Sequence, residues 1–165
     1  MKLAAIENVV RVIFPLSMMR EGELLPAAFK LREQQDGPEK YLSVFRQFAA
    51  SFNEDILQFD KGRNLPCCIL NVGEVNGIEL TVAENIVNYE VRAVPTNTFR
   101  SHGGIFIRIG GIPLEGSGAK AFEILKIGEE ASFLIVAIRR RLMNVAQKSM
   151  TAVGQLSNDR RSKNG

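Results

Sequence analysis

The chain contains few of the residues that specialised sites require: one histidine, two cysteines and no tryptophan among 165 residues. Cys67 and Cys68 are adjacent, and neighbouring side chains on a strand point to opposite faces. They cannot pair with each other, which excludes a disulfide framework. One histidine and two adjacent thiols also cannot supply a usual zinc ligand set, and the carboxylates show no cation-binding spacing. We therefore expect no metal site.

Long apolar runs are also missing. The longest, Phe133 to Ile138, is far shorter than the roughly 20 residues that a transmembrane helix needs. Glu7 and Arg11 interrupt the apolar stretch near the first residue, which argues against a secretory signal peptide. Together with unpaired cysteines, these features predict a cytoplasmic protein that makes no membrane contact.

Charge is unevenly distributed along a chain of ordinary globular composition, with 45% hydrophobic and 24% charged residues. The segment from Arg139 to Gly165 carries a formal charge of +6, and the remainder carries −3. This basic end permits contact with nucleic acid or an acidic protein. The arginines that would make such a contact are Arg139, Arg140, Arg141, Arg160 and Arg161.

Hydrophobic periodicity predicts strands in the first two thirds of the chain and helices in the last third. The expected strands are Val9 to Phe14, Tyr41 to Arg46, Cys67 to Val72, Tyr89 to Val94 and Gly104 to Ile109. The expected helices are Asp55 to Phe59, Gly118 to Lys126 and Glu129 to Lys148, the last with the clearest apolar stripe. Residues 73–87 fit either a hairpin turning at Asn76-Gly77 or a short helix, and periodicity alone leaves both open.

Strands followed by helices indicate an α+β fold. We predict a single domain over residues 1–150, with a mixed or mostly antiparallel sheet and C-terminal helices packed on one face. Residues 151–165 lose their periodicity and are predicted to form a basic tail that is frayed or disordered.

The candidate catalytic residues are His102, Arg11 and Arg46. His102 is the only histidine, and its side chain titrates near neutral pH, so it can transfer protons. Two glycines follow it and could bring the backbone close to a ligand. Arg11 and Arg46 each interrupt an apolar strand face, and a charge there needs a partner or a wet cleft. We predict that the three side chains line one polar cleft.

Three further residues are predicted to bind the ligand in that cleft: Ser43, Arg100 and Arg108. Arginines beside a histidine suit a phosphate or a carboxylate. The alternative is that the strand arginines reach solvent or pair with acids such as Glu54 or Glu90, while His102 is structural. The glycine-rich segment Gly110 to Gly118 departs from a phosphate-binding loop because Lys120 comes too late, and we expect a flexible turn there. No cofactor is indicated.

Four short motifs recur in a fixed order. They are R-x-x-x-P from Arg11 to Pro15, G-x-L-x-x-x-A-F from Gly22 to Phe29, L-S-V from Leu42 to Val44, and the late His102 before an apolar strand. In this order the chain resembles a group of small uncharacterised bacterial proteins. The resemblance implies a bacterial accessory protein, of a toxin–antitoxin or phage-defence locus, and it brings no established activity.

Two functions therefore stay open. The first is an accessory protein with an anion- or nucleotide-binding cleft. The second is a non-catalytic interaction protein that binds nucleic acid or an acidic protein through its basic C-terminal helix and tail. Whether Arg11, Arg46 and His102 converge decides between them.

Overall fold

The computed structural model describes residues 1–82, 84–128 and 130–156. Several predictions fall outside these residues: the first residue of the last helix, Glu129, and the part of the basic tail that carries Arg160 and Arg161.

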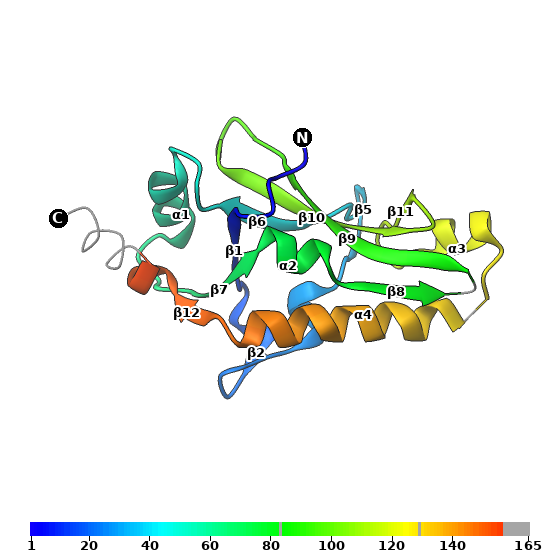
Figure 1. Ribbon diagram of the computed structural model, residues 1–165. Coiled ribbons are helices and arrows are strands. Elements are labelled where there is room, and N and C mark those ends of the chain that lie inside the picture. The colour runs from blue at the N-terminus through cyan, green and yellow to red at the C-terminus, as the bar shows by residue number, and fades with distance from the viewer. Residues whose placement is uncertain (83, 129, 157–165) are drawn as a thin grey trace.

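One antiparallel sheet organises the described chain (Figure 1). Its strands follow the order β12-β7-β1-β6-β10-β9-β8, with β11 paired to β10, and it curls like half a barrel. The strands are β1 (Asn8–Val12), β6 (Leu42–Arg46), β7 (Pro66–Asn71), β8 (Glu79–Val82), β9 (Asn85–Ala93), β10 (His102–Ile109), β11 (Ile112–Pro113) and β12 (Met150–Ala152). The predicted α+β fold with a mostly antiparallel sheet is confirmed.

Side-chain alternation along the strands gives the sheet two apolar faces. Val9, Leu70 and Cys68 belong to the larger core, whereas Val10 and Cys67 belong to a smaller core on the opposite face. The adjacent thiols therefore point in opposite directions, and both are free. Burial raises the pKa of each thiol to about 12, so both are inert at neutral pH.

Helices cover both faces. The helices are α1 (Phe52–Asp60), α2 (Val72–Asn76), α3 (Ala119–Leu125) and α4 (Glu130–Gln147), with 3₁₀ turns η1 (Leu16–Met18) and η2 (Pro26–Phe29). The apolar stripe of α4 explains its position, since Ile135, Ile138, Leu142 and Ala146 are buried in the larger core. Helix α1 covers the smaller core with Phe52 and Ile56.

Local departures from the predictions have identifiable causes. Residues 73–87 contain both a short helix and a hairpin, the two predicted alternatives. The Asn71 side chain caps α2, and β8 then pairs with β9. Asn76-Gly77 ends this helix instead of forming a hairpin turn. Strands β4 (Glu33–Gln34) and β5 (Gly37–Pro38) form a short hairpin, and a second one joins β2 (Met19–Arg20) to β3 (Glu23–Leu24).

The predicted domain boundary at residue 150 falls inside β12. Met150, Thr151 and Ala152 pair with β7, and Val153 and Leu156 are buried in the smaller core. Residues 151–156 therefore belong to the folded domain. The pairing was not predicted because a three-residue strand is too short to show alternation.

Candidate functional site

The site begins where β1 and β6 separate. These strands pair at Val9↔Arg46 and Val10↔Phe45, whereas β1 continues along β7 as far as Val12. Arg11 joins the separating strands through its side chain. Its Nη1 donates to the Ser43 carbonyl at 2.7 Å, and its Nε and Nη2 donate to the Ala28 carbonyl at 2.9 and 2.7 Å.

The Arg11 guanidinium forms no ion pair with a carboxylate among the residues that the structure describes. Burial lowers its pKa to about 10, the charge of Glu39 acts to raise it, and the charge of Arg32 acts to lower it. The group therefore stays protonated at neutral pH. A guanidinium has five N–H donors, and the three atoms above leave donors for a further acceptor.

Arg11 forms part of a pocket of about 270 Å³. Five polar residues line it: Arg11, Arg32, Glu39, Ser43 and His102. Five apolar residues complete the wall: Val12, Phe14, Phe45, Phe59 and Phe99. With His102 neutral, the lining carries two positive charges and one negative charge, so the pocket favours an anion.

Aromatic rings form the apolar side of the pocket. Phe45, Phe59 and Phe99 meet edge to face, with ring centroids 5.6, 5.4 and 6.2 Å apart. They come from β6, from α1 and from the segment before β10, so only the fold brings them together. Phe14 adds a fourth ring, whose face is covered by the Arg63 guanidinium at 4.4 Å. Such a wall suits a flat apolar or heterocyclic ligand.

Arg32 and Glu39 reach the pocket because they flank the β4–β5 hairpin. The Glu39 N–H donates to the Arg32 carbonyl, and the Arg32 N–H donates to Glu39 Oε1 at 2.7 Å. Their side chains also form an ion pair of 3.6 Å. Neither residue was predicted from the sequence. The sequence signal that could have identified them is the turn-rich stretch from Gln34 to Pro38, which lies between the oppositely charged Arg32 and Glu39.

His102 is the first residue of β10 instead of a loop residue, and it is buried with 8% of its surface exposed. Its Nδ1 lies 2.8 Å from the Val94 carbonyl. A carbonyl only accepts, so Nδ1 carries the proton and Nε2 is the nitrogen left for a ligand. Tyr41 and Phe45 contact the ring edge to face at 5.8 and 6.4 Å.

A buried carboxylate holds the segment that leads into His102. Asp55 of α1 accepts hydrogen bonds from Ser101 N at 2.9 Å, Ser101 Oγ at 2.6 Å and Ser51 Oγ at 3.0 Å. Burial acts to raise the pKa of Asp55, but these hydrogen bonds outweigh it and lower the pKa. Ser101 is fully buried, so its two hydrogen bonds to Asp55 hold the backbone that leads into His102.

The glycines after His102 serve packing. A Cβ on Gly104 would lie 2.8 Å from the Tyr41 ring, and one on Gly103 would lie 3.0 Å from the Arg92 carbonyl. The space beside Gly104 is therefore filled by the Tyr41 ring of the protein itself. This corrects the prediction that the two glycines bring the backbone close to a ligand.

The structure brings Arg11, Ser43 and His102 together and leaves Arg46, Arg100 and Arg108 outside the pocket. Arg46 lies at the other end of the β1–β6 ladder and pairs with Glu7 at 3.0 Å. Arg100 is exposed, and its charge acts on Asp55. The predicted single cleft is corrected in this respect: both arginines interrupt an apolar strand face as predicted, but Arg46 finds its partner in Glu7, outside the pocket.

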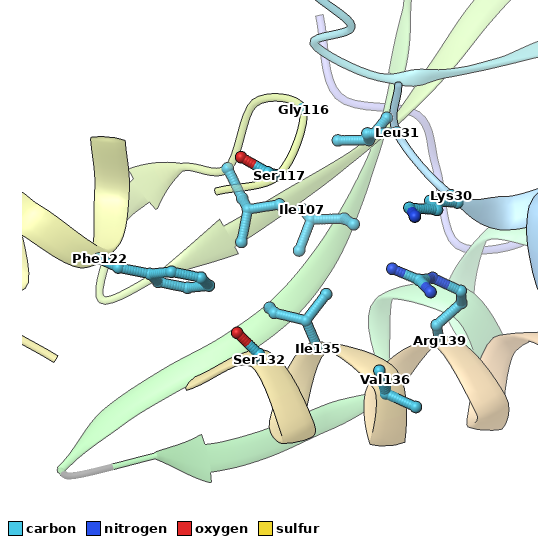
Figure 2. A pocket seen from close by; sticks show the side chains of 11 residues that line it. Lys30, Leu31, Ile107, Gly116, Ser117, Phe122, Ser132, Ile135, Val136 and Arg139 are labelled. Carbon is cyan, nitrogen blue, oxygen red and sulfur yellow. The ribbon is translucent and has the colours of Figure 1, made fainter. Parts of the chain in front are cut away.

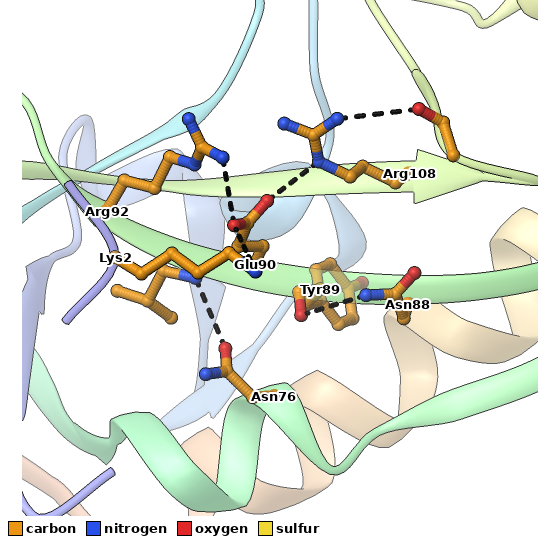
Figure 3. Close-up of polar contacts among 9 residues, drawn as sticks. Lys2, Asn76, Asn88, Tyr89, Glu90, Arg92 and Arg108 are labelled. Atoms are coloured by element: carbon orange, nitrogen blue, oxygen red, sulfur yellow. Dashed lines mark hydrogen bonds and ion pairs between the residues drawn. The ribbon is translucent and has the colours of Figure 1, made fainter. Parts of the chain in front are cut away.

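Arg108 belongs to a different cluster, on the outer face of β9 and β10 (Figure 3). Its Nε donates to Glu90 at 2.7 Å, and Arg92 and Lys2 approach the same carboxylate at 3.0 and 3.4 Å. Burial acts to raise the pKa of Glu90, but the hydrogen bonds and charges of Arg92 and Arg108 outweigh it and lower the pKa. The alternative that a strand arginine pairs with an acid is thus confirmed for Arg46, although its partner is Glu7, whereas Glu90 pairs with Arg108, Arg92 and Lys2.

The predicted basic helix face divides into separate environments. Arg139 is half-buried, Arg140 is exposed, and Arg141 donates to the Glu79 carbonyl at 3.0 Å. The glycine-rich segment Gly110 to Gly118 is a turn, β11 and the approach to α3. There the Ser117 N–H donates a hydrogen bond to Glu33 Oε1 at 2.9 Å.

Within residues 1–82, 84–128 and 130–156, no three His, Cys, Asp or Glu side chains form a group that could hold a metal ion. No helix in that part of the chain has the length and apolar character needed to cross a membrane. The sequence matches no protein-family model, and neither the curated proteins nor the solved structures contain a match.

Proposed function

We propose that this protein binds a small phosphate-bearing ligand with a flat ring, of the mononucleotide class, in the pocket between β1, β6 and the start of β10. Arg46 does not join Arg11 and His102 as expected, but Arg32 does. The observation that carries the proposal is therefore the convergence of Arg11, Arg32 and His102 on a pocket walled by four phenylalanines.

The two sides of the pocket suit the two parts of such a ligand. Guanidinium groups bind phosphate through charge-assisted hydrogen bonds, and Arg11 is already fixed in place by two carbonyls. Phenylalanine rings accept the face or edge of a nucleobase. Glu39 can accept a hydrogen bond from an amino or hydroxyl group of the ligand.

His102 is the one histidine among the residues that line this pocket, and an imidazole can accept or donate a proton. Its Nδ1–H is committed to Val94, so Nε2 either accepts from the ligand or, when protonated, adds a positive charge. The accessory role expected from the resemblance, in a toxin–antitoxin or phage-defence locus, is compatible with a protein that senses a nucleotide.

Calorimetric titration of the full chain with nucleoside monophosphates and with inorganic phosphate tests this function. We expect His102→Ala and Arg32→Gln each to weaken monophosphate binding about tenfold or more, because each removes a hydrogen bond to a charged group worth about 1.5–3 kcal/mol. Arg100→Gln is the matched control, since it removes an exposed charge two residues from His102 and outside the pocket.

Binding that is equal in all three variants, or absent in the wild-type protein, would refute the proposal. Circular dichroism of each variant shows whether the fold is retained.

A further inference from the structure

A second pocket, of about 250 Å³, lies on the opposite face of the sheet between α4, β10 and the segment that follows η2 (Figure 2). It shares no lining residue with the first pocket. Two cations line it: Lys30, which directly follows η2, and Arg139 of α4. No acidic residue lines the pocket within the described chain.

The two cations have no neutralising partner among the described residues. The side chains of Lys30 and Arg139 form no hydrogen bond and no ion pair with any residue described by the structure. Burial lowers the pKa of Arg139, and only the Tyr89 hydroxyl acts to raise it. A half-buried guanidinium without an acceptor is destabilising, and an anion between the two groups would remove that cost.

One carboxylate is close by, and it is already committed. Glu33 Oε1 accepts from the Ser117 N–H at 2.9 Å, and Glu33 forms no ion pair with Lys30 or Arg139 among the described contacts. In Figure 2 the Lys30 amino group and the Arg139 guanidinium are drawn toward the same end of the pocket.

The other end of the pocket is apolar. Ile107 of β10, Phe122 of α3 and Ile135 of α4 line it, and Figure 2 shows the Phe122 ring far from the two cations. Ser132, one turn before Ile135 on α4, adds a hydroxyl to the lining. Ser132, Ile135 and Arg139 follow the spacing of a single helix face, so α4 presents polar and apolar groups along one line.

We propose that this pocket binds a small amphipathic anion, with a carboxylate or phosphate head between Lys30 and Arg139 and a body of about one aromatic ring against Phe122 and Ile135. Arginine forms paired hydrogen bonds with either head, and lysine adds a point charge. The pocket volume of about 250 Å³ lies just below the roughly 300–1,000 Å³ of pockets for drug-sized ligands, so the body of the ligand is limited to about one ring.

Titration of the full chain, followed by NMR, with phenyl phosphate, benzoate, inorganic phosphate and benzyl alcohol tests the site. We expect phenyl phosphate or benzoate to bind about tenfold more tightly than inorganic phosphate and benzyl alcohol, because only the first two fill both ends. The stronger of the two identifies the head group as phosphate or carboxylate, and either order supports the site.

Variants locate the binding. Lys30→Gln and Arg139→Gln should each weaken it about tenfold, the usual worth of a hydrogen bond to a charged group. Arg140→Gln, at the exposed neighbouring position on α4, should change the dissociation constant by no more than about twofold. Arg32→Gln alters the first pocket, so unchanged binding in this variant shows that the ligand occupies the second pocket.

Lys30 is exposed, so Lys30→Gln still tests the site if Arg139→Gln does not fold. Benzyl alcohol binding as tightly as phenyl phosphate, no binding by the wild-type chain, or binding insensitive to Lys30→Gln would overturn the proposal.

Discussion

Gly104 shows how a single residue is determined by a neighbouring strand. Its missing side chain leaves room for the Tyr41 ring, which also packs against Phe106 at 5.1 Å and against His102 at 5.8 Å. The glycine thus fixes the aromatic contacts around the candidate histidine.

We expect Gly104→Ala to lower the free energy of unfolding by about 1–3 kcal/mol, the usual cost of overpacking a filled site. Gly128→Ala is the control, because a Cβ there meets nothing within 4 Å. Urea denaturation measures both changes, and equal stability of the two variants would show that Tyr41 moves aside freely.

Residue patterns predicted part of the candidate site. Arg11 could be found because a charge within an apolar strand needs an acceptor, and His102 because it is the only histidine. Arg32 and the four phenylalanines could not, since they come from separate segments that only the curled sheet brings together. Arg46 was misplaced because a charge on an apolar strand face shows that the group needs a partner and not which partner it finds, and here the partner is Glu7.

At the scale of elements, α4 and β12 show which features periodicity can reveal. The eighteen-residue helix α4 repeats its apolar stripe often enough to be recognised, and its bounds differ little from those predicted. Strand β12 has three residues and is defined only by its partner β7. The last described segment therefore belongs to the sheet, which no local pattern indicates.

Two truncations test the contribution of this segment. Ending the chain at Ser149 should cost about 3 kcal/mol or more and favour aggregation, because Val153 and Leu156 leave the smaller core and the edge of β7 is exposed. Ending it at Leu156 should leave the melting temperature nearly unchanged, since residues 157–165 have no apolar periodicity. Equal melting temperatures and equal gel-filtration profiles would contradict the docking of β12.

At the scale of the whole molecule, two buried carboxylates make stability depend on pH. The pKa values of Asp55 and Glu90 are lowered in the folded protein. As the pH falls, the unfolded chain therefore takes up protons before the folded protein does. The stability that the two carboxylates contribute is fully present above their ordinary pKa values, 3.8 for Asp55 and 4.5 for Glu90, and it is lost as the pH falls through their lowered pKa values in the folded protein.

Ser101→Ala isolates the share of Asp55. We expect it to cost about 1.5–3 kcal/mol at pH 7, where Ser101 Oγ donates to a carboxylate, and less at a pH below the lowered pKa of Asp55, where the carboxyl group is protonated. Ser17→Ala, at an exposed position, is the control. Urea denaturation at both pH values measures the difference, and an equal loss at both would show that the hydrogen bond is not coupled to ionisation.

The short ladder between β1 and β6 also determines how the sheet can come apart. Two residue pairs join these strands, against five between β1 and β7 and seven between β10 and β9. Arg11 braces one end of this junction through Ser43, and the Arg46–Glu7 pair lies at the other. In hydrogen exchange, partial opening would therefore begin at this junction and separate β12-β7-β1 from β6-β10-β9-β8 before either unit unfolds.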